Sequence, residues 1–199
     1  MALEHLTLAR GRTGRPRANQ DGPSQTISAF PPSSPRQCTS GCAEKSFEGG
    51  TAPAESRIVE ERMYRLGQKT PFLSSTVKKA WESGLQAPQD EAPTWIHGDL
   101  HPQNVLVKKG SIRCVIDWAD MARGDRATDL ASIWMLLPSV ASRASAIAEY
   151  GSIASANWCR AIGWAVLFGV LLLETGLADN PRHAKIGELT LRRIAEGPH

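Results

Sequence analysis

Several features that would mark a special class of protein are scarce in this sequence. Its four cysteines are too few for a disulfide scaffold in a chain of 199 residues, and they indicate a reducing compartment. The net charge of +3 is too small to imply nucleic acid or an anionic membrane as a partner. The longest apolar run, residues 161–173, falls short of the roughly 20 residues that cross a bilayer, and the N-terminus lacks the pattern of a secretory signal. We therefore expect a cytoplasmic protein with no membrane and no nucleic acid as partner.

The composition divides the chain into two parts. With 41% hydrophobic and 22% charged residues, the whole sequence is close to the globular average and can bury one core. Residues 1–56, however, hold six Pro, six Gly and seven Ser without a helical or strand period, so we expect a disordered tail there and a folded domain over 57–195. The arginine-rich segment 10–17 is either a nucleic-acid or targeting patch or a solvated part of that tail. Cys38 and Cys42 lack a second metal-ligating pair at zinc spacing, so no zinc site is expected.

The folded part is predicted to contain a hairpin followed by a helical bundle. Short helices are expected over 57–66 and from Ser74 or Ser75 to Leu85, and a β-like passage begins at Trp95. Two β-branched runs, 105–107 and 112–116, are separated by the turn 108–111 and form the hairpin. After it, apolar residues recur with a helical period, which predicts helices around residues 130–137, 147–150, 158–173 and 186–194.

Polar side chains are expected to converge at one end of this hairpin. If residues 108–111 form the loop, antiparallel pairing puts Asn104 opposite Val115. Asn104 and Asp117 then come to the same end, and Asp99 arrives there on the preceding loop. Such a set suits phosphoryl transfer from a nucleotide, which needs a carboxylate to accept a hydroxyl proton and oxygen ligands for the Mg²⁺ that bridges the phosphates.

The same residues carry a family resemblance. His97, Asp99 and Asn104 match the kinase catalytic-loop pattern H-x-D-x-x-x-x-N, with an aspartate at the next strand end. Gly98 replaces the arginine of protein kinases, and Asp-Trp-Ala at 117–119 replaces their Asp-Phe-Gly. The segments His-Gly-Asp-Leu-His-Pro-x-Asn-Val-Leu (97–106), Ile-Asp-Trp (116–118) and Gly-Asp-x-x-x-Asp-Leu-Ala (124–131) closely resemble the aminoglycoside phosphotransferase family, also called the phosphotransferase enzyme family.

The resemblance spans residues 57–194 and implies an α+β fold, the C-terminal lobe of a two-lobed protein-kinase-like structure. It implies that Asp99 is the catalytic base and that Asn104 and Asp117 are Mg²⁺ ligands that also bind the ATP or GTP cofactor. His97 and Asp125 would brace the loop. The implied partner is a small molecule with a hydroxyl acceptor, and the family's acceptors range from aminoglycosides and macrolides to choline-like alcohols, homoserine and sugars.

Several of these residues also have structural interpretations. His97 is expected to be structural, since Asp99 already supplies the base. His101 could approach the substrate or phosphate or only support the loop, and it is the next candidate for the base. The position of Asp120 is left open by the sequence. Asp125 and Asp129, four residues apart, are typical of a capped first helical turn, in which carboxylates accept free amides. Trp118 is expected to pack beneath the loop that carries Asp117, the implied metal ligand.

The sequence shows no counterpart of the nucleotide-clamping half of a kinase. There is no G-x-G-x-x-G loop, and no lysine lies in a strand-like apolar run upstream of His97. The N-terminal lobe is therefore expected to be missing, and two functions remain open. The chain is either an ATP-dependent O-phosphotransferase or a non-catalytic remnant or binding module of the family. A lobe without its partner would expose an apolar face, so self-association is expected.

Overall fold

The computed structural model describes residues 53–89 and 92–196, and this part of the chain is mainly helical. The helices are α1 (Pro53–Lys69), α2 (Ser75–Gln86), α3 (Ala127–Leu130), α4 (Ser132–Leu136), α5 (Val140–Tyr150), α6 (Ser155–Asp179) and α7 (Pro181–Ala195). The strands are β1 (Thr94–Ile96), β2 (Val105–Lys108), β3 (Ser111–Val115) and β4 (Ala122–Gly124). Two short 3₁₀ helices, η1 (Pro102–Asn104) and η2 (Trp118–Asp120), follow β1 and β3 respectively.

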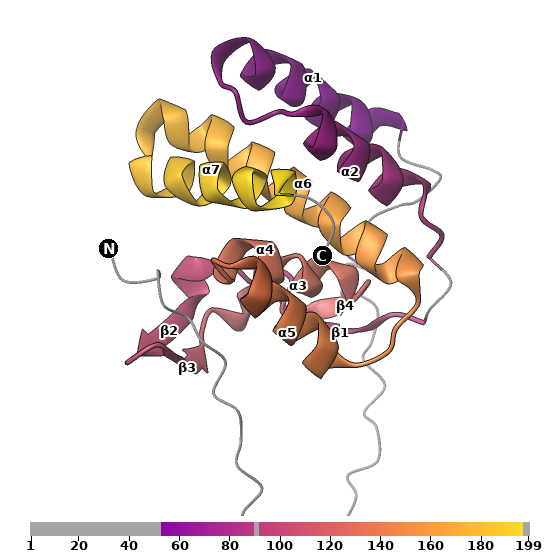
Figure 1. The fold of residues 1–199 in the computed structure, drawn as a ribbon, viewed down its shortest axis with the longest axis vertical. Coiled ribbons are helices and arrows are strands. Elements are labelled where there is room, and N and C mark those ends of the chain that lie inside the picture. The colour runs from indigo at the N-terminus through magenta and orange to yellow at the C-terminus, as the bar shows by residue number, and fades with distance from the viewer. Residues whose placement is uncertain (1–52, 90–91, 197–199) are drawn as a thin grey trace, which may run out of the picture.

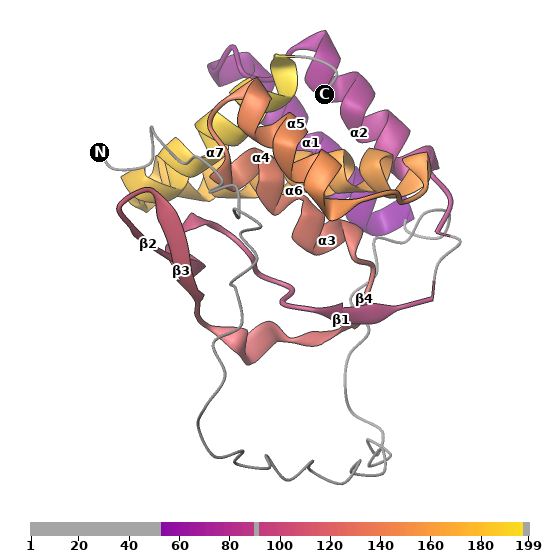
Figure 2. The ribbon, with the colours of Figure 1, turned by 60° about the horizontal axis from the view of Figure 1, so that its bottom comes forward.

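The helices form layers around α6 and α7. In Figure 1, α1 and α2 lie on one side of the α6–α7 pair, and α3, α4 and α5 lie on the other with the strands. Turning the molecule shows the β1–β4 and β2–β3 pairs beyond the helices, at one edge of the domain (Figure 2). The two strand pairs therefore lie together along one edge of the helical bundle.

Helix α6 is the centre of the bundle. It packs against α1, α2, α3, α4 and α7, and its residues Ala161, Ala165, Val166 and Val170 are fully buried. The helix extends beyond the apolar run 161–173 in both directions. Among the described residues it is the one helix long and apolar enough to cross a membrane by length and composition alone. The helix expected over 158–173 is thus confirmed, and its packing makes it the core helix of the described domain.

Helices α6 and α7 approach each other closely at Gly187. A Cβ atom at this position would lie 2.4 Å from the backbone nitrogen of Leu173 and 2.6 Å from the carbonyl oxygen of Gly169. Real Cβ atoms do not approach backbone this closely, so only glycine allows the two helices to pack at this separation. The backbones of the two helices are therefore in direct contact at Gly187.

The predicted helices all occur, with different ends. Helix α1 runs from Pro53 to Lys69, past the predicted range 57–66, and stops before Thr70 and Pro71. Ser74 caps α2 as expected, because its Oγ accepts the Val77 N–H at 3.3 Å. The predicted tail over 1–56, with its arginine-rich segment and two cysteines, falls almost wholly outside the described residues. Only 53–56 can be compared, and they belong to α1.

The hairpin is present, but its predicted register is wrong by one residue at the open end. Near the turn, Val107 pairs with Ile112, as a regular ladder from the loop requires. One step further on, Leu106 pairs with Cys114. Arg113 therefore has no partner on β2, which is the signature of a β-bulge. Beyond the bulge Val105, rather than Asn104, is opposite Val115.

A second strand pair was only half visible in the sequence. Strand β1 occurs where the β-like passage was expected, and it pairs antiparallel with β4, with Ile96 opposite Ala122. The β4 sequence Ala-Arg-Gly has low strand propensity, so the partner left no signal. This pairing brings the residue after β1, His97, close to the start of α3.

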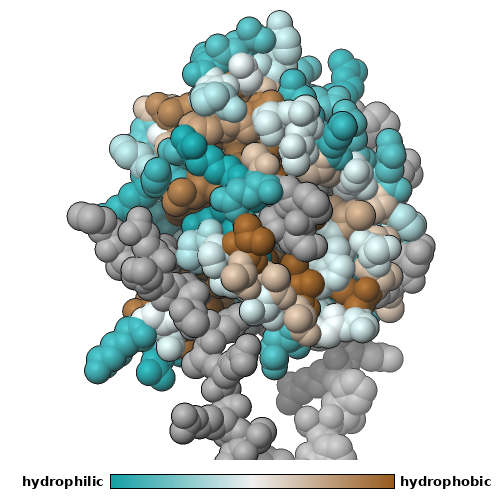
Figure 3. Space-filling model, viewed as in Figure 1, coloured by the Kyte–Doolittle hydropathy of each residue, from teal (hydrophilic) through white to brown (hydrophobic). Residues whose placement is uncertain are grey.

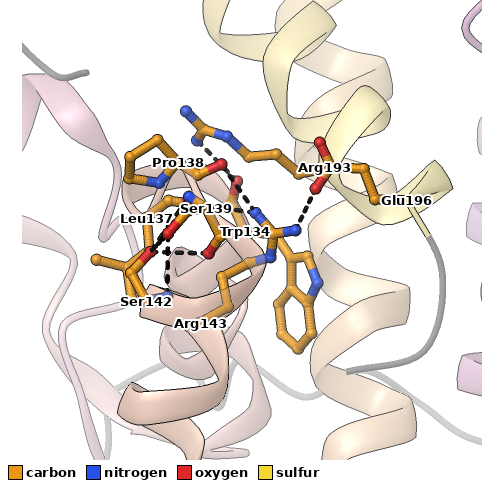
Figure 4. Close-up of polar contacts among 8 residues, drawn as sticks. All are labelled: Trp134, Leu137, Pro138, Ser139, Ser142, Arg143, Arg193 and Glu196. Carbon is orange, nitrogen blue, oxygen red and sulfur yellow. Dashed lines mark hydrogen bonds and ion pairs between the residues drawn. The ribbon is translucent and has the colours of Figure 1, made fainter. Parts of the chain in front are cut away.

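Two buried arginines hold the end of α4 (Figure 4). Arg193 of α7 donates to the carbonyl oxygens of Trp134 and Met135 at 3.0 and 2.7 Å. Arg143 of α5 donates to the carbonyl oxygens of Leu137 and Pro138, both at 3.2 Å, and pairs with Glu196. Burial and the Arg143 guanidinium lower the pKa of Arg193, while Glu196 raises it. The carbonyl groups left free at the helix end thus find donors inside the protein.

Apolar residues also reach the surface. Figure 3 shows them on one face as several separate groups among hydrophilic residues. Large apolar side chains that are at least 38% exposed among the described residues include Trp95, Leu106, Ile112, Ile116, Trp118 and Met121. These six belong to the strands and the loops that join them. The self-association expected from such a surface stays a prediction.

Candidate active site

The loop between β1 and β2 brings Asp99 and Asn104 into direct contact. The Nδ2 group of Asn104 donates to the carbonyl oxygen of Asp99 at 2.9 Å and to its carboxylate Oδ2 at 3.0 Å. Asn104 is buried, whereas 40% of the Asp99 side chain is exposed. His101 Nε2 lies 3.3 Å from the same Oδ2 atom. Asp99 is thus held by the buried Asn104 side chain and remains accessible to a ligand.

His97 connects this loop to the segment that contains Asp117. Its ring is buried, with Nδ1 accepting the Asp99 backbone N–H at 3.3 Å and Nε2 3.0 Å from the carbonyl oxygen of Ile116. Since Nδ1 faces a donor, the proton of a neutral ring belongs on Nε2, which then donates to Ile116. The side chain therefore joins Asp99 to the residue that precedes Asp117.

Asp129 holds the same loop from α3, which corrects the interpretation of this residue as a cap of its own helix. Its carboxylate accepts the backbone N–H of His97 at 2.7 Å and that of Gly98 at 3.0 Å. The β1–β4 pairing places these two amides beside α3, so the carboxylate meets them instead of the amides of the first turn. Gly98 has φ of 83°, a conformation that glycine adopts without steric cost.

Asp125 has the predicted local contact and a further one. Its Oδ1 accepts the Ala127 N–H at 3.0 Å, as a residue that starts a helix does. Its Oδ2 also accepts from Arg160 Nε of α6 at 2.6 Å. This ion pair is almost completely buried, with 3% of the Asp125 side chain and 1% of the Arg160 side chain exposed.

Arg160 was not identified as a site residue from the sequence, where it fell within the helix expected over 158–173. Its guanidinium also donates to Asn157 Oδ1 at 2.5 Å and to the carbonyl oxygen of Pro88, beyond α2. A charged residue at the head of an apolar helical run requires an internal partner, and that signal could have identified it. Arg160 ties α6 and the segment after α2 to the start of α3, where Asp129 lies.

Asp117 lies closer to Asn104 than the sequence predicted. Because of the bulge in β3, the Ile116 N–H donates to the Asn104 carbonyl oxygen at 2.9 Å, so Asp117 directly follows the residue bonded to Asn104. Asp117 has φ of 63° and ψ of 64°, in the left-handed region, and no side-chain cap bond to η2. Its carboxylate is exposed at the turn from β3 to η2. The structure thus brings the two predicted metal ligands to the same end of the hairpin.

The donor set at this end fits Mg²⁺. The Nδ2 group of Asn104 bonds to Asp99, and within the described residues no hydrogen bond to its Oδ1 is found, so this oxygen can serve as a ligand, as can the exposed Asp117 carboxylate. Among the described residues there is no group of three or more His, Cys, Asp or Glu side chains suited to a metal. Mg²⁺ commonly takes only one or two protein ligands and completes its shell with phosphate oxygens and water. The oxygens of Asn104 and Asp117 are of the type and number that such a site uses.

Trp118 lies at a pocket beside this loop rather than beneath it. Its indole ring is 54% exposed, lies 4.8 Å from the His97 ring and donates through Nε1 to the carbonyl oxygen of Val115 at 3.0 Å. The neighbouring pocket has a volume of about 220 Å³, and its lining includes Trp95, Leu100 and Met121. Asp120 is exposed on η2.

Similar proteins are found among kinases of small molecules. Thiamine kinases from Salmonella paratyphi B and Salmonella newport are 32% identical over 68 residues, which is 34% of this chain and 24% of theirs. A thermostable mutant of the aminoglycoside phosphotransferase APH(4)-Ia, solved with AMP-PNP and hygromycin B, is 22% identical with a TM-score of 0.43. This match covers 71% of the present chain and 50% of the APH(4)-Ia chain. The macrolide 2'-phosphotransferase MphH from Brachybacterium faecium is 21% identical with a TM-score of 0.36, over 72% and 49% of the two chains.

This chain therefore spans about a quarter of the matched thiamine kinases and about half of the solved structures. The model of one family, the phosphotransferase enzyme family, matches residues 41–164. This match includes the loop with Asp99 and Asn104, the hairpin, Asp117, and the start of α3 with Asp125 and Asp129. The chain has the α+β, protein-kinase-like fold that the sequence predicted. On this match over more than half of its length, the chain belongs to the phosphotransferase enzyme family.

Proposed function

We propose that this chain carries the catalytic half of an ATP-dependent, Mg²⁺-assisted phosphotransferase that acts on a hydroxyl group of a small molecule. The contact between Asn104 and Asp99 supports this function most directly. One amide group bonds the candidate base, and its oxygen remains free for a cation. The candidate base and one candidate metal ligand are therefore in direct contact, which suits phosphoryl transfer because this reaction depends on positioning.

Each residue has a distinct task in the proposed reaction. The Asp99 carboxylate orients the attacking hydroxyl and accepts its proton, which its exposure to solvent permits. The oxygens of Asn104 and Asp117 would hold Mg²⁺, which neutralises the charge of the phosphates when bound. His97 and Asp129 keep the loop in place through the bonds described above, and Asp125 fixes the start of α3. GTP can replace ATP in this scheme, since none of these residues selects between adenine and guanine.

The small-molecule acceptor is the partner of this site, and we place the reaction in the cytoplasm. The matched kinases are named for thiamine, so thiamine is a reasonable first compound. A screen should add an aminoglycoside, a macrolide and choline, because the hydroxyl group is the shared chemistry and the described residues do not specify the rest of the acceptor.

The proposal is tested with the full 199-residue chain, Mg²⁺ and ATP, by the release of ADP with and without each acceptor. Acceptor-dependent ADP release that Asp99→Asn reduces by about 10²-fold or more supports the proposal, because a general base contributes about 10² to 10⁴. Asp179→Asn, an exposed carboxylate at the end of α6, is the matched control and should keep full activity. Lack of both ADP release from ATP and GDP release from GTP would favour the non-catalytic alternative.

A further inference from the structure

Each ring nitrogen of His101 has a defined polar neighbour. Nδ1 lies 3.2 Å from the backbone nitrogen of Gln103, and Nε2 lies 3.3 Å from Oδ2 of Asp99. A backbone N–H can only donate, so Nδ1 must accept. The proton of the neutral ring therefore belongs on Nε2, the nitrogen that lies beside the Asp99 carboxylate. The backbone of Gln103 selects the tautomer in which the N–H group of His101 is the one next to Asp99.

The two oxygens of the Asp99 carboxylate are consequently not equivalent. Oδ2 accepts from the Nδ2 group of Asn104 at 3.0 Å and lies 3.3 Å from Nε2 of His101. No hydrogen bond to Oδ1 is found within residues 53–89 and 92–196. Because 40% of the side chain is exposed, Oδ1 is the oxygen that a ligand can reach.

We propose that His101 is a positioning residue for the reaction. By donating to Oδ2 together with Asn104, it stops rotation of the Asp99 carboxylate and keeps Oδ1 directed at the acceptor hydroxyl. A base is effective only when it is held within hydrogen-bond reach of the proton it removes, and small misplacements are costly. The proposal rests on the proposed function, in which Asp99 is the base.

His101 also has a structural task that the experiment must separate from the first. Through Nδ1 it caps η1, and its backbone carbonyl accepts the Asn104 N–H at 3.0 Å. Two substitutions divide these tasks. In His101→Asn, the amide oxygen replaces Nδ1 and can still cap Gln103, but the side chain is too short to reach Asp99. In His101→Gln, the amide nitrogen replaces Nε2 and can donate to Asp99, but no acceptor remains near Gln103.

The two variants are compared by kcat for ADP release, by KM for Mg-ATP and by thermal melting. We expect His101→Asn to lower kcat about tenfold or more with little change in KM, and His101→Gln to retain more of the kcat. We expect the opposite order in stability, with His101→Gln melting at the lower temperature because the cap is lost. If kcat and melting temperature fall in the same order, the role is structural and the proposal is overturned.

Two further measurements separate this proposal from the proposed function. Asp99→Asn is assayed in parallel, and retained activity there refutes Asp99 as the base and with it the positioning role. The tautomer is read from ¹⁵N NMR of the His101 ring at about pH 8.5, above the usual titration range of histidine. A proton on Nε2 whose signal shifts in Asp99→Asn supports the contact without any turnover. A proton on Nδ1, or no shift, overturns the proposal.

Discussion

The carboxylate of Asp129 accepts the backbone N–H of His97 at 2.7 Å, although the two residues are 32 positions apart in the chain. The same carboxylate accepts the N–H of Gly98 at 3.0 Å. One side chain of α3 therefore holds the backbone N–H groups of the two residues that precede Asp99. The conformation of the candidate catalytic loop depends on the helical bundle as much as on the loop itself.

Replacing Asp129 by asparagine should destabilise the protein and loosen this loop. The amide has one acceptor oxygen, so one of the two backbone N–H groups would face an N–H₂ group instead. A buried donor without a partner costs about 1–3 kcal/mol. The free energy of unfolding, measured with urea, should fall by that amount in Asp129→Asn. An unfolding curve that overlays that of the unaltered protein would contradict the two bonds.

Removal of Arg160 should be more damaging, because it leaves Asp125 as a buried charge without its ion-pair partner. Breaking a buried pair from one side costs about 3–5 kcal/mol, which is a large part of the stability of an ordinary domain. We expect Arg160→Ala to lower the unfolding free energy by that amount. Arg65→Ala is the matched control, since Arg65 is half-exposed in its pair with Glu174, and such pairs contribute about 0–1 kcal/mol. Equal losses in both variants would refute the special role of Arg160.

Mg²⁺ should stabilise the folded chain if Asn104 and Asp117 bind it together. A ligand at about 100 times its dissociation constant adds about 2.7 kcal/mol to the unfolding free energy. Thermal melts with Mg²⁺ or Mn²⁺ and nucleotide should show the shift in the unaltered chain and lose it in Asp117→Ala. Asp120→Ala removes a neighbouring exposed carboxylate and should keep the shift. A shift that survives in Asp117→Ala would place the cation elsewhere.

The contact between α6 and α7 should tolerate no side chain at Gly187. Overpacking costs about 1–3 kcal/mol, and more where backbone must move, so Gly187→Ala should lower the melting temperature clearly. Gly67→Ala in α1 is the control, since its Cβ would meet only Leu73 Cβ at 3.8 Å. That substitution should stabilise the protein by about 0.4–1 kcal/mol through the unfolded chain. A harmless Gly187→Ala would show that the two helices can separate.

The sequence predicted the local elements and the loop that contains Asp99, because these depend on nearby residues. Ser74 caps its helix as a serine before an apolar period should, and the hairpin turn lies between two β-branched runs. The long-range contacts were not predictable in this way. By its position, Asp129 could have capped its own helix. It reaches His97 because β1 pairs with β4, and the β4 sequence has too low a strand propensity for that pairing to be predicted.

The bulge was missed for a related reason. Arg113 is an ordinary strand residue by composition, and nothing in the run 111–115 marks it as unpaired. The consequence reached the site, because the register decides which residue is opposite Asn104. The prediction that Asn104 and Asp117 share one end of the hairpin was correct in outline, and the bulge brings them one position closer than the regular ladder would.

The same bulge allows the hairpin to lose one residue without a change of register at its open end. Ile112, Arg113 and Cys114 are all exposed, so their identities can drift over evolutionary time with little effect on the core. Deleting Arg113 would restore the regular ladder and leave Leu106 opposite Cys114, so that Ile116 stays bonded to Asn104 and Asp117 still follows it. Inserting a residue between Val115 and Asp117 would instead move Asp117 by one strand position, about 3.3 Å, away from Asn104. A deletion at Arg113 should therefore be far more frequent among descendants of this sequence than an insertion between Val115 and Asp117.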